Sequence, residues 1–382
     1  MSRVAVSRDV LSWVINRSGL TAGTLQRKFP KIGQWQTGDS QPTLRQLESL
    51  AKATLTPLGY FFLPTPLEER LPIPHFRTLG DEPLRRPSPD LLHTMQVMQR
   101  RQAWMREFLT EQGQDRLPFV ASARQDEPSH AVADRIRRVL RFDEGWAAQQ
   151  ATWTGALRVL RDAMETANIL IVVNGIVGNN THRKLDPNEF RGFVLVDEYA
   201  PLVFVNGVDG KAAQMFTLAH ELAHVFFGSS AAFDLRDMQP ANDPTEQACN
   251  RVAAEFLVPE RELRRIWSSI RDDPEPFQAL ARQFKVSALV AARRALDLQL
   301  IRRTEFLDFY NAYQEDERRA ATQRPGGGDF YSTQNARVGR RFAHTVVRAA
   351  QEGKLLYSEA YRLTGLYGTA FVRYAASLGG PR

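Results

Sequence analysis

Residues 211–228, KAAQMFTLAHELAHVFFG, decide which fold and which chemistry this chain can have. The segment has the periodicity of a buried helix and contains the pattern HExxH. His220 and His224 lie one turn apart on the same helix face, where both imidazoles can bind one cation. Glu221 projects about 100° around the helix, close to that cation without being a ligand. Because its neighbours are small or apolar, a charged Glu221 is costly there without a metal, and we predict a metal site.

The metal site needs a third protein ligand, because a catalytic zinc has three protein ligands and one open position. No third histidine follows closely, since residues 225–236 read VFFGSSAAFDLR. In the predicted helix at 243–259, Glu246 shares one face with Asn250, and we choose Glu246 as the ligand. Glu255, near the end of the same helix, is the alternative. Cys249 is expected to pack in the core.

This set of residues predicts metal-assisted hydrolysis. Zn²⁺ acts as a Lewis acid and lowers the pKa of its water toward about 7, so that Glu221 can take a proton during attack on a peptide carbonyl. A site of two histidines and one carboxylate also accepts Mn²⁺, which leaves the identity of the metal open.

The rest of the chain predicts an α+β fold that is mainly α. Runs rich in β-branched and aromatic residues predict strands at 168–174, 190–197 and 202–206. The interval 175–187 has the breakers of a loop. Helical periodicity covers residues 8–62, 90–141 with a break near 112–129, 153–166 and 330–377. We therefore expect a small sheet and a helical core around the HExxH helix, flanked by two helical domains.

The N-terminal residues 1–64 resemble an XRE-type helix-turn-helix domain. In that pattern a Trp, a Gly and a Pro-Thr pair close off the recognition helix, and here these are Trp35, Gly38 and Pro42-Thr43. The segment between Phe29 and Trp35 is short and carries Pro30, whereas a recognition helix needs more residues to reach base edges. Two interpretations remain open, namely DNA binding and a small helical module that binds protein or packs on the next domain.

Composition and charge exclude several classes of protein. The chain has 382 residues, 43% of them hydrophobic and 24% charged, which is typical of a globular protein with two to three domains. A lone Cys249 forbids an intramolecular disulfide, and no apolar run is long enough for a membrane helix, so we expect a cytoplasmic protein. The net charge of +7 divides into +5 for residues 1–64, −6 for 65–317 and +8 for 318–382. The positive charge therefore belongs to the two ends.

The predicted domain boundaries follow these patterns. Residues 63–90 carry seven prolines, so 65–90 is predicted to be a linker. Residues 91–317 are predicted to form the catalytic domain, and 318–382 a basic C-terminal domain that contains the hinge PGGG at 325–328. The C-terminal domain combines arginines with tyrosines, a composition typical of interfaces. We choose Arg337, Arg340 and Arg341 as residues that bind an acidic partner. The alternative is a solvated basic face over an aromatic core.

Four segments together resemble the ImmA/IrrE family of zinc metallopeptidases, in the subgroup fused to an XRE-like N-terminus. They are TLAHELAHVFFG, the E-x-x-x-N helix that ends AAEFLVP, the preceding FRGFVLVDEYAPLVFVNGVDGKAAQMF, and LPIPHFRT. The resemblance implies a gluzincin-like fold with His220, His224 and Glu246 as ligands and Glu221 as general base. It also implies cleavage of helix-turn-helix repressors in stress responses or mobile-element induction, or an antitoxin role in toxin–antitoxin pairs.

Three functional hypotheses follow. The first is a zinc endopeptidase that cleaves a cytoplasmic regulatory protein, an XRE-type repressor. The second is an antitoxin or regulator that acts by binding a toxin encoded nearby, and operator DNA through residues 1–64. The third is a DNA-binding autoregulator. None of them requires a membrane.

Overall fold

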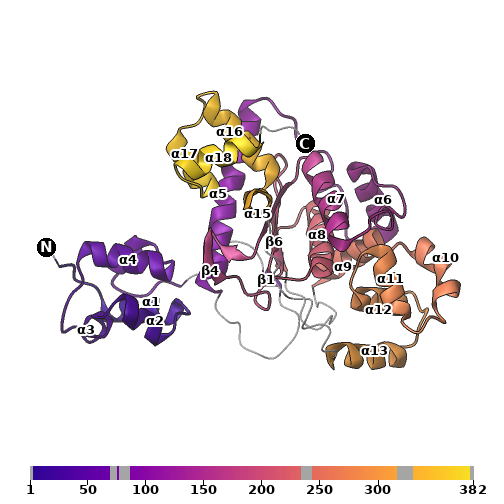
Figure 1. Cartoon of the computed structure of the whole chain (residues 1–382), viewed down its shortest axis with the longest axis horizontal. Coiled ribbons are helices and arrows are strands. Elements are labelled where there is room, and N and C mark those ends of the chain that lie inside the picture. Colours follow the sequence, from indigo (N-terminus) through magenta and orange to yellow (C-terminus); the bar gives the residue numbers. More distant parts are fainter. Residues whose placement is uncertain (1–2, 69–74, 77–86, 234–242, 316–329, 379–382) are drawn as a thin grey trace. The chain divides into compact units, whose positions relative to one another are not determined.

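The computed structural model describes residues 3–68, 75–76, 87–233, 243–315 and 330–378 (Figure 1). The chain folds as two compact units, Met1–Pro72 with Asp81–Val97, and Ile73–Gly80 with Met98–Arg382. The described part is mainly helical and has a five-stranded sheet and a two-stranded one, which confirms the predicted α+β class. Within the described residues, no helix combines the length and the apolar character needed to cross a membrane.

The first unit is a small helical bundle with its own core. Its helices are α1 (Arg8–Arg17), α2 (Ala22–Lys28), α3 (Ile32–Thr37), α4 (Leu44–Thr54) and the 3-10 helix η1 (Leu58–Phe62). Val14, Trp35 and Leu47 are buried where α1, α3 and α4 meet. The helix α3 has only six residues and follows Pro30.

The second unit contains a five-stranded sheet. Its strands are β1 (His75–Phe76), β2 (Leu170–Asn174), β5 (Gly192–Leu195), β6 (Leu202–Asn206) and β7 (Ala231–Phe233), in the order β1-β7-β5-β6-β2. β2 runs parallel to β6, while β5 is antiparallel to both β6 and β7. Every residue of β2, β5 and β6 is buried, which is typical of strands covered on both faces.

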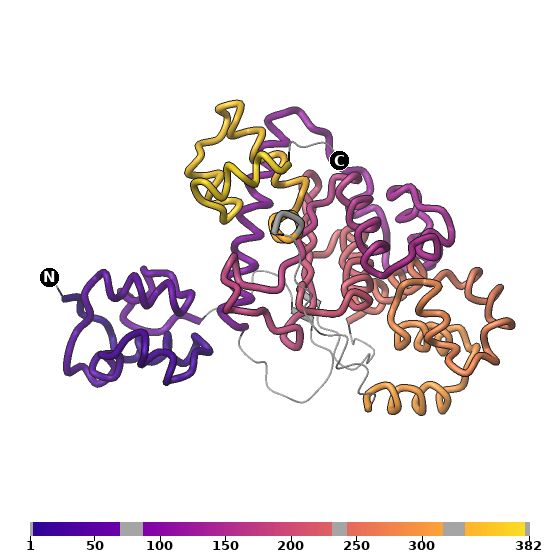
Figure 2. The backbone as a smooth tube through the Cα atoms, viewed as in Figure 1, coloured from indigo at the N-terminus to yellow at the C-terminus, as the bar shows by residue number. Residues whose placement is uncertain are grey.

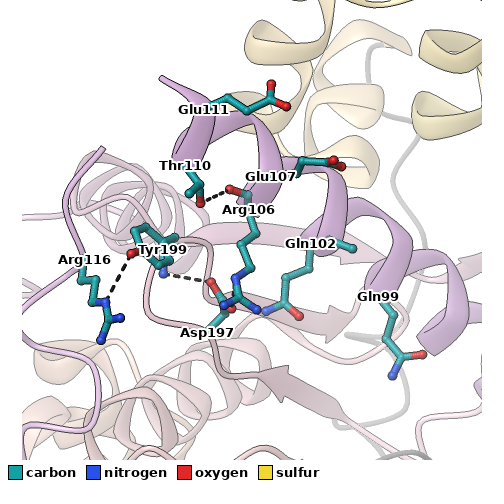
Figure 3. A pocket seen from close by; sticks show the side chains of 10 residues that line it. Gln99, Gln102, Arg106, Glu107, Thr110, Glu111, Arg116, Asp197 and Tyr199 are labelled. Atoms are coloured by element: carbon teal, nitrogen blue, oxygen red, sulfur yellow. Dashed lines mark hydrogen bonds and ion pairs between the residues drawn. The ribbon is translucent and has the colours of Figure 1, made fainter. Parts of the chain in front are cut away.

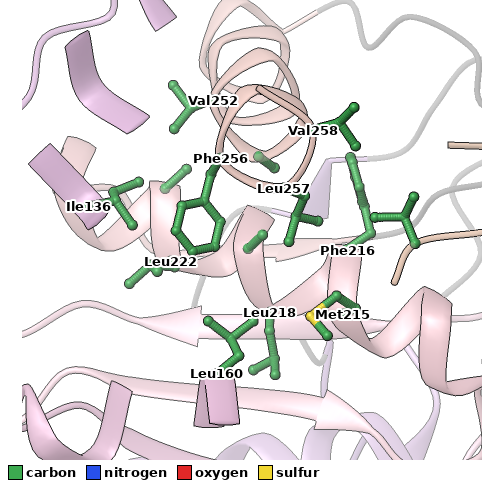
Figure 4. Packing of buried hydrophobic residues seen from close by; sticks show 14 of the residues in the cluster. Ile136, Leu160, Met215, Phe216, Leu218, Leu222, Val252, Phe256, Leu257 and Val258 are labelled. Carbon is green, nitrogen blue, oxygen red and sulfur yellow. The ribbon is translucent and has the colours of Figure 1, made fainter. Parts of the chain in front are cut away.

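Two helices, α7 (Trp153–Thr166) and α8 (Lys211–Phe227), pack on this sheet. Two more, α6 (Ser129–Leu140) and α9 (Pro244–Leu257), pack on these helices and on each other, and α8 and α9 carry the candidate metal ligands. The HExxH helix α8 lies against β5 and β6 on one side and against α9 on another. Leu222 of α8 and Phe256 of α9 share one large apolar core (Figure 4). α8 is buried from Gln214 to Phe226 because neighbours surround it, as its sequence predicted.

The remaining helices of the second unit complete the described chain. They are the part of α5 (Pro89–Glu111) after Val97, then α10 (Glu260–Ile270), α11 (Pro276–Phe284), α12 (Ala288–Asp297), α13 (Arg303–Glu315), α15 (Phe330–Val338), α16 (Arg340–Gln351), α17 (Tyr357–Thr364) and α18 (Thr369–Leu378). Although α15 and α16 are far from β2 in sequence, both contact it (Figure 2). Gly339 between them has a φ of 87°, and a Cβ there would lie 2.8 Å from the carbonyl oxygen of Ile171. Only glycine allows this approach.

One prediction from the sequence is wrong, and others concern residues outside the described part of the chain. The interval 175–187 is not a loop, because β3 (Ile176–Val177) and β4 (Asn180–Lys184) form an antiparallel hairpin with an irregular register. Asn174 stabilises its turn, since its side chain donates to Gly178 and accepts from the N–H of Ile176. The hinge at 325–328 and most of the predicted linker 65–90 lie outside the described residues. The predicted domain boundaries stay predictions.

Candidate metal centre

The structure brings three of the predicted site residues together. His220 and His224 on α8 face Glu246 on α9, and one ligand atom from each lies within 4.8 Å of the others. The two histidine Nε2 atoms are 3.1 Å apart. Glu246 places Oε2 3.1 Å from Nε2 of His220 and Oε1 3.0 Å from Nε2 of His224. All three side chains are buried.

Hydrogen bonds on the far side of each imidazole orient the ligand atoms. Nδ1 of His220 lies 3.0 Å from Oδ1 of Asn250, which can only accept, so the proton of a neutral His220 is on Nδ1 and Nε2 carries a lone pair. Nδ1 of His224 lies 2.9 Å from Oγ of Ser229. Both Nε2 atoms thereby point to the same place as the carboxylate of Glu246.

Burial and neighbouring charges act in opposite directions on this cluster. Burial lowers the pKa of His220, and the nearby charge of Glu246 offsets burial only in part. Burial raises the pKa of Glu246, but the contacts with His220 and His224 outweigh it and lower that pKa to about 2. Those contacts favour the ionised carboxylate only while the facing imidazoles supply a proton or a positive charge. A cation held by the same three side chains would supply that charge when both imidazoles are neutral.

Glu221 is buried without a hydrogen-bond partner. Within the described residues neither carboxylate oxygen has one, and the side chain is fully shielded from solvent. Burial raises the pKa of Glu221 well above its usual value, and the charge of Glu246 adds to this effect. The group beside it is Gly192 of β5, where a Cβ would lie 3.1 Å from Oε1 of Glu221 and 2.6 Å from Cγ2 of Thr217. Gly192 thus keeps space open next to the carboxylate.

The donor set fits a zinc ion. Zinc binds histidine nitrogen and carboxylate oxygen at about 2.0–2.2 Å, and tetrahedral geometry then separates neighbouring ligand atoms by roughly 3.3 Å. The observed separations of 3.0–3.1 Å are close to this value. The carboxylate of Glu221 has no hydrogen-bond partner among the described residues. A hydrolytic metal site needs such a free carboxylate next to the ion to accept a proton. The group His220, His224 and Glu246 can therefore hold a metal ion.

Residues 164–296 match the family model of the IrrE N-terminal-like domain, Peptidase_M78. This match supports a protease, and it spans every residue of the centre described above. Residues 338–377 match a second family model, a domain of unknown function named DUF8813. No curated protein matches the chain.

The other two candidates, Glu255 and Cys249, do not belong to the group of ligand atoms that lie within 4.8 Å of one another. Glu255 forms an ion pair with Arg294 and accepts from the backbone N–H of Glu260 at 3.3 Å, so it holds the end of α9. Burial raises the pKa of Glu255, and the positive charge of Arg294 counteracts this rise. Cys249 is a buried free thiol, as expected of a core residue.

The three arginines predicted to bind a partner lie outside the IrrE-like match, on α15 and α16. Arg337, Arg340 and Arg341 are all half-buried. Burial lowers the pKa of Arg337 and of Arg341, and Glu165 counteracts this effect at Arg341. Their role in partner binding stays a prediction.

Two residues that border the centre, Ser229 and Gly192, were not predicted from the sequence. Ser229 follows the helix-ending Gly228, and its backbone N–H bonds the carbonyl of His224 at 3.1 Å, which turns its hydroxyl back to the same histidine. A polar residue just after the helix end was the available signal. Gly192 stands within a strand, where a glycine often marks a close approach.

Proposed function

We propose that this chain is a zinc-dependent endopeptidase whose ion is held by His220, His224 and Glu246. One observation carries the proposal: two imidazole nitrogens and a carboxylate converge within 4.8 Å beside the buried, unpartnered carboxylate of Glu221. The two-histidine, one-glutamate donor set is one that zinc hydrolases use. Mn²⁺ is the alternative ion for the same ligands.

We assign each residue around the ion a separate role in the hydrolysis. A bound zinc ion supplies a Lewis acid that polarises the scissile carbonyl and acidifies water. Glu221 acts as general base, accepting a proton from the attacking water and passing it to the leaving amine nitrogen. The burial that raises the pKa of Glu221 favours uptake of this proton. Asn250 and Ser229 hold the two imidazoles in place.

We propose a regulatory protein, an XRE-type repressor, as the substrate. The support is the match to the IrrE N-terminal-like domain, together with a helical N-terminal unit whose sequence resembles the XRE pattern. The short α3 argues against DNA reading by that unit, since six residues offer few side chains to base edges. We therefore assign it to protein contact, with DNA contact as the alternative.

The test compares wild type, Glu221→Gln and Glu255→Gln on the repressor encoded nearest to this gene. We expect cleavage by wild type and by Glu255→Gln, and none by Glu221→Gln, although that variant keeps its zinc. Cleavage fragments are identified by mass spectrometry and zinc by elemental analysis. Equal cleavage by wild type and Glu221→Gln, or a purified protein without bound metal, would overturn the proposal.

The same variants separate the peptidase from an antitoxin that acts by binding. Co-expression with a toxin encoded nearby is the relevant assay. Neutralisation by Glu221→Gln at the wild-type level assigns the function to binding. A variant that still binds the toxin but fails to neutralise it assigns the function to proteolysis.

A further inference from the structure

A cavity of about 430 Å³ lies between the end of α5, α16 and α18, away from the metal centre. Its described lining combines basic, polar and apolar side chains: Phe108, Leu109, Gln114, Arg341, His344, Thr345, Val347, Arg348, Gln351, Ala375 and Leu378. No described lining residue is acidic. Cavities of about 300–1,000 Å³ accept small molecules.

Arg341 is the residue that points to a ligand. Its Nε is buried and has no hydrogen-bond partner in the described part of the chain. Glu165 accepts the backbone N–H of Arg341 at 3.3 Å, and its charge counteracts the effect of burial on the pKa of the guanidinium. No ion pair to the Arg341 guanidinium occurs among the described residues. A buried donor without an acceptor costs free energy, and an anion in the cavity would supply that acceptor.

The walls restrict what kind of anion fits. Phe108, Leu109 and Leu378 are buried apolar side chains that face the cavity. At its rim Arg348 is exposed, and its contact with Glu352 is long, at 3.7 Å. The cavity therefore offers one half-buried guanidinium, one rim guanidinium and an apolar wall.

A second groove differs from this cavity, because its arginines have acidic partners. It lies along α5 and the segment at 197–199, and its arginines are already paired (Figure 3). Arg106 contacts Asp197 at 3.3 Å, and Arg116 contacts Glu198 at 3.1 Å and Tyr199 at 3.2 Å. That groove leaves no cation in need of a ligand.

We propose that the cavity bounded by α5, α16 and α18 binds a small organic anion, in which a phosphate or carboxylate head is carried on an apolar group. The head lies against Arg341, with Arg348 at the rim, and the apolar group lies on Phe108, Leu109 and Leu378. Both arginines and most of the lining belong to residues 338–377, the segment that matches the domain of unknown function, while the apolar wall comes from α5 and Leu378. It is independent of the peptidase chemistry.

The experiment titrates the full-length protein with four defined probes by isothermal titration calorimetry. Phenyl phosphate and benzoate share an apolar ring and differ in the head, inorganic phosphate has the head alone, and benzamide is the neutral analogue. We expect phenyl phosphate or benzoate to bind at least about tenfold more tightly than inorganic phosphate and benzamide. Whichever of the two binds more tightly identifies the head. The assignment fails if neither organic anion binds, or if benzamide or inorganic phosphate binds equally well.

Variants locate the binding. Arg341→Gln should weaken the better probe by about tenfold or more, since a charge-assisted pair is lost. Arg348→Gln, at an exposed rim position, should weaken it by a smaller factor and keeps the proposal testable if Arg341→Gln does not fold. Arg362→Gln, an exposed arginine of α17, is the matched control and should bind as wild type does. Unchanged affinity in both cavity variants would overturn the proposal.

Discussion

At the scale of single residues, the centre is defined by a carboxylate that the protein buries and leaves unbonded. Glu221 has no hydrogen-bond partner among the described residues, while its neighbour on the helix, His220, is oriented by Asn250. A buried charge without a partner destabilises the fold unless a ligand compensates it. The metal-free protein should therefore be less stable than the loaded one.

The pH dependence of this cost gives a first prediction. Burial raises the pKa of the Glu221 carboxyl in the folded, metal-free protein. In the unfolded chain the pKa of a glutamate is about 4.3. Above that pH the folded state therefore keeps the Glu221 proton while the unfolded state has lost it. The unfolded state then binds fewer protons, so stability falls as pH rises above that value. Glu221→Gln removes the titrating carboxyl, so the stability of this variant does not fall with pH for this reason. In chelator-treated protein we expect its melting temperature to exceed that of wild type at pH 7–8 and the difference to vanish toward pH 4.

Thermal melts from pH 4 to pH 8 measure this difference. The exposed Glu107→Gln is the control and should follow wild type at every pH. A difference between Glu221→Gln and wild type that stays constant with pH would contradict the explanation.

The choice between the two glutamates of α9 is a second prediction. Glu246→Ala removes a ligand, so we expect bound zinc to fall from about one ion per chain to a small fraction of that. Glu255→Gln leaves the ligands intact and should keep its zinc, although it loses stability because Arg294 stays buried without its ion pair. Elemental analysis after dialysis distinguishes them, and zinc loss in Glu255→Gln alone would reverse our assignment.

At the scale of elements, the start of α9 controls where Glu246 lies. The side chain of Asp243 accepts the backbone N–H groups of Thr245 at 2.8 Å and Glu246 at 3.1 Å. The cap therefore fixes the first turn, which carries the third candidate ligand. The corresponding cap of α12 is Ser287, which accepts from Val290 at 3.1 Å and lies on a helix without a metal ligand.

These two caps give a matched prediction. Asp243→Ala and Ser287→Ala should each lower the free energy of unfolding by about 1 kcal/mol, as losses of a helix cap do. Only Asp243→Ala should also weaken zinc binding, by several-fold, since it loosens the turn that holds Glu246. Competition with a fluorescent zinc chelator measures the affinity, and equal zinc affinities in the two variants would contradict a positioning role for Asp243.

Elements also show where sequence patterns predict well and where they do not. α7, α8 and β6 have the predicted bounds. The sequence of α8 has a clear end signal in Gly228, and β6 is a short run of β-branched and aromatic residues followed by Asn206-Gly207. The β3–β4 hairpin was missed since β4 is polar and mostly exposed, so no hydrophobic alternation marks it. Its turn depends on hydrogen bonds of Asn174, which a composition rich in breakers does not reveal.

At the scale of the whole molecule, one buried arginine joins distant parts of the second unit. Nε of Arg101 on α5 donates to the carbonyl of Leu363 at 2.9 Å, and Nη1 donates to the carbonyls of Arg337 at 3.0 Å and Val338 at 3.3 Å. Burial lowers the pKa of Arg101 to about 10. The guanidinium also lies over the ring of Phe342, 5.6 Å from its centroid. These contacts tie the ends of α15 and α17 to α5.

Arg101 gives a fourth prediction. Arg101→Met leaves buried carbonyls without donors, and we expect a loss of about 2–4 kcal/mol in the free energy of unfolding. Faster hydrogen exchange should appear first in α15 to α18, because their anchor is lost. The adjacent, exposed Arg100→Met is the control. Unchanged exchange in these helices would contradict the anchoring role.

The sequence by itself determined the α+β class, the HExxH helix and the candidates His220, His224, Glu221 and Glu246. It could do so because helical spacing alone puts two histidines on one face and a glutamate next to them. Only the tertiary structure decided which carboxylate approaches them, since the distance between α8 and α9 depends on packing between helices. It also placed Ser229, Gly192 and Arg101, whose contacts join residues that local periodicity does not relate. The positive charge of the C-terminal residues was evident from composition. Only packing left Arg341 half-buried at a cavity, with its Nε unbonded within the described part of the chain.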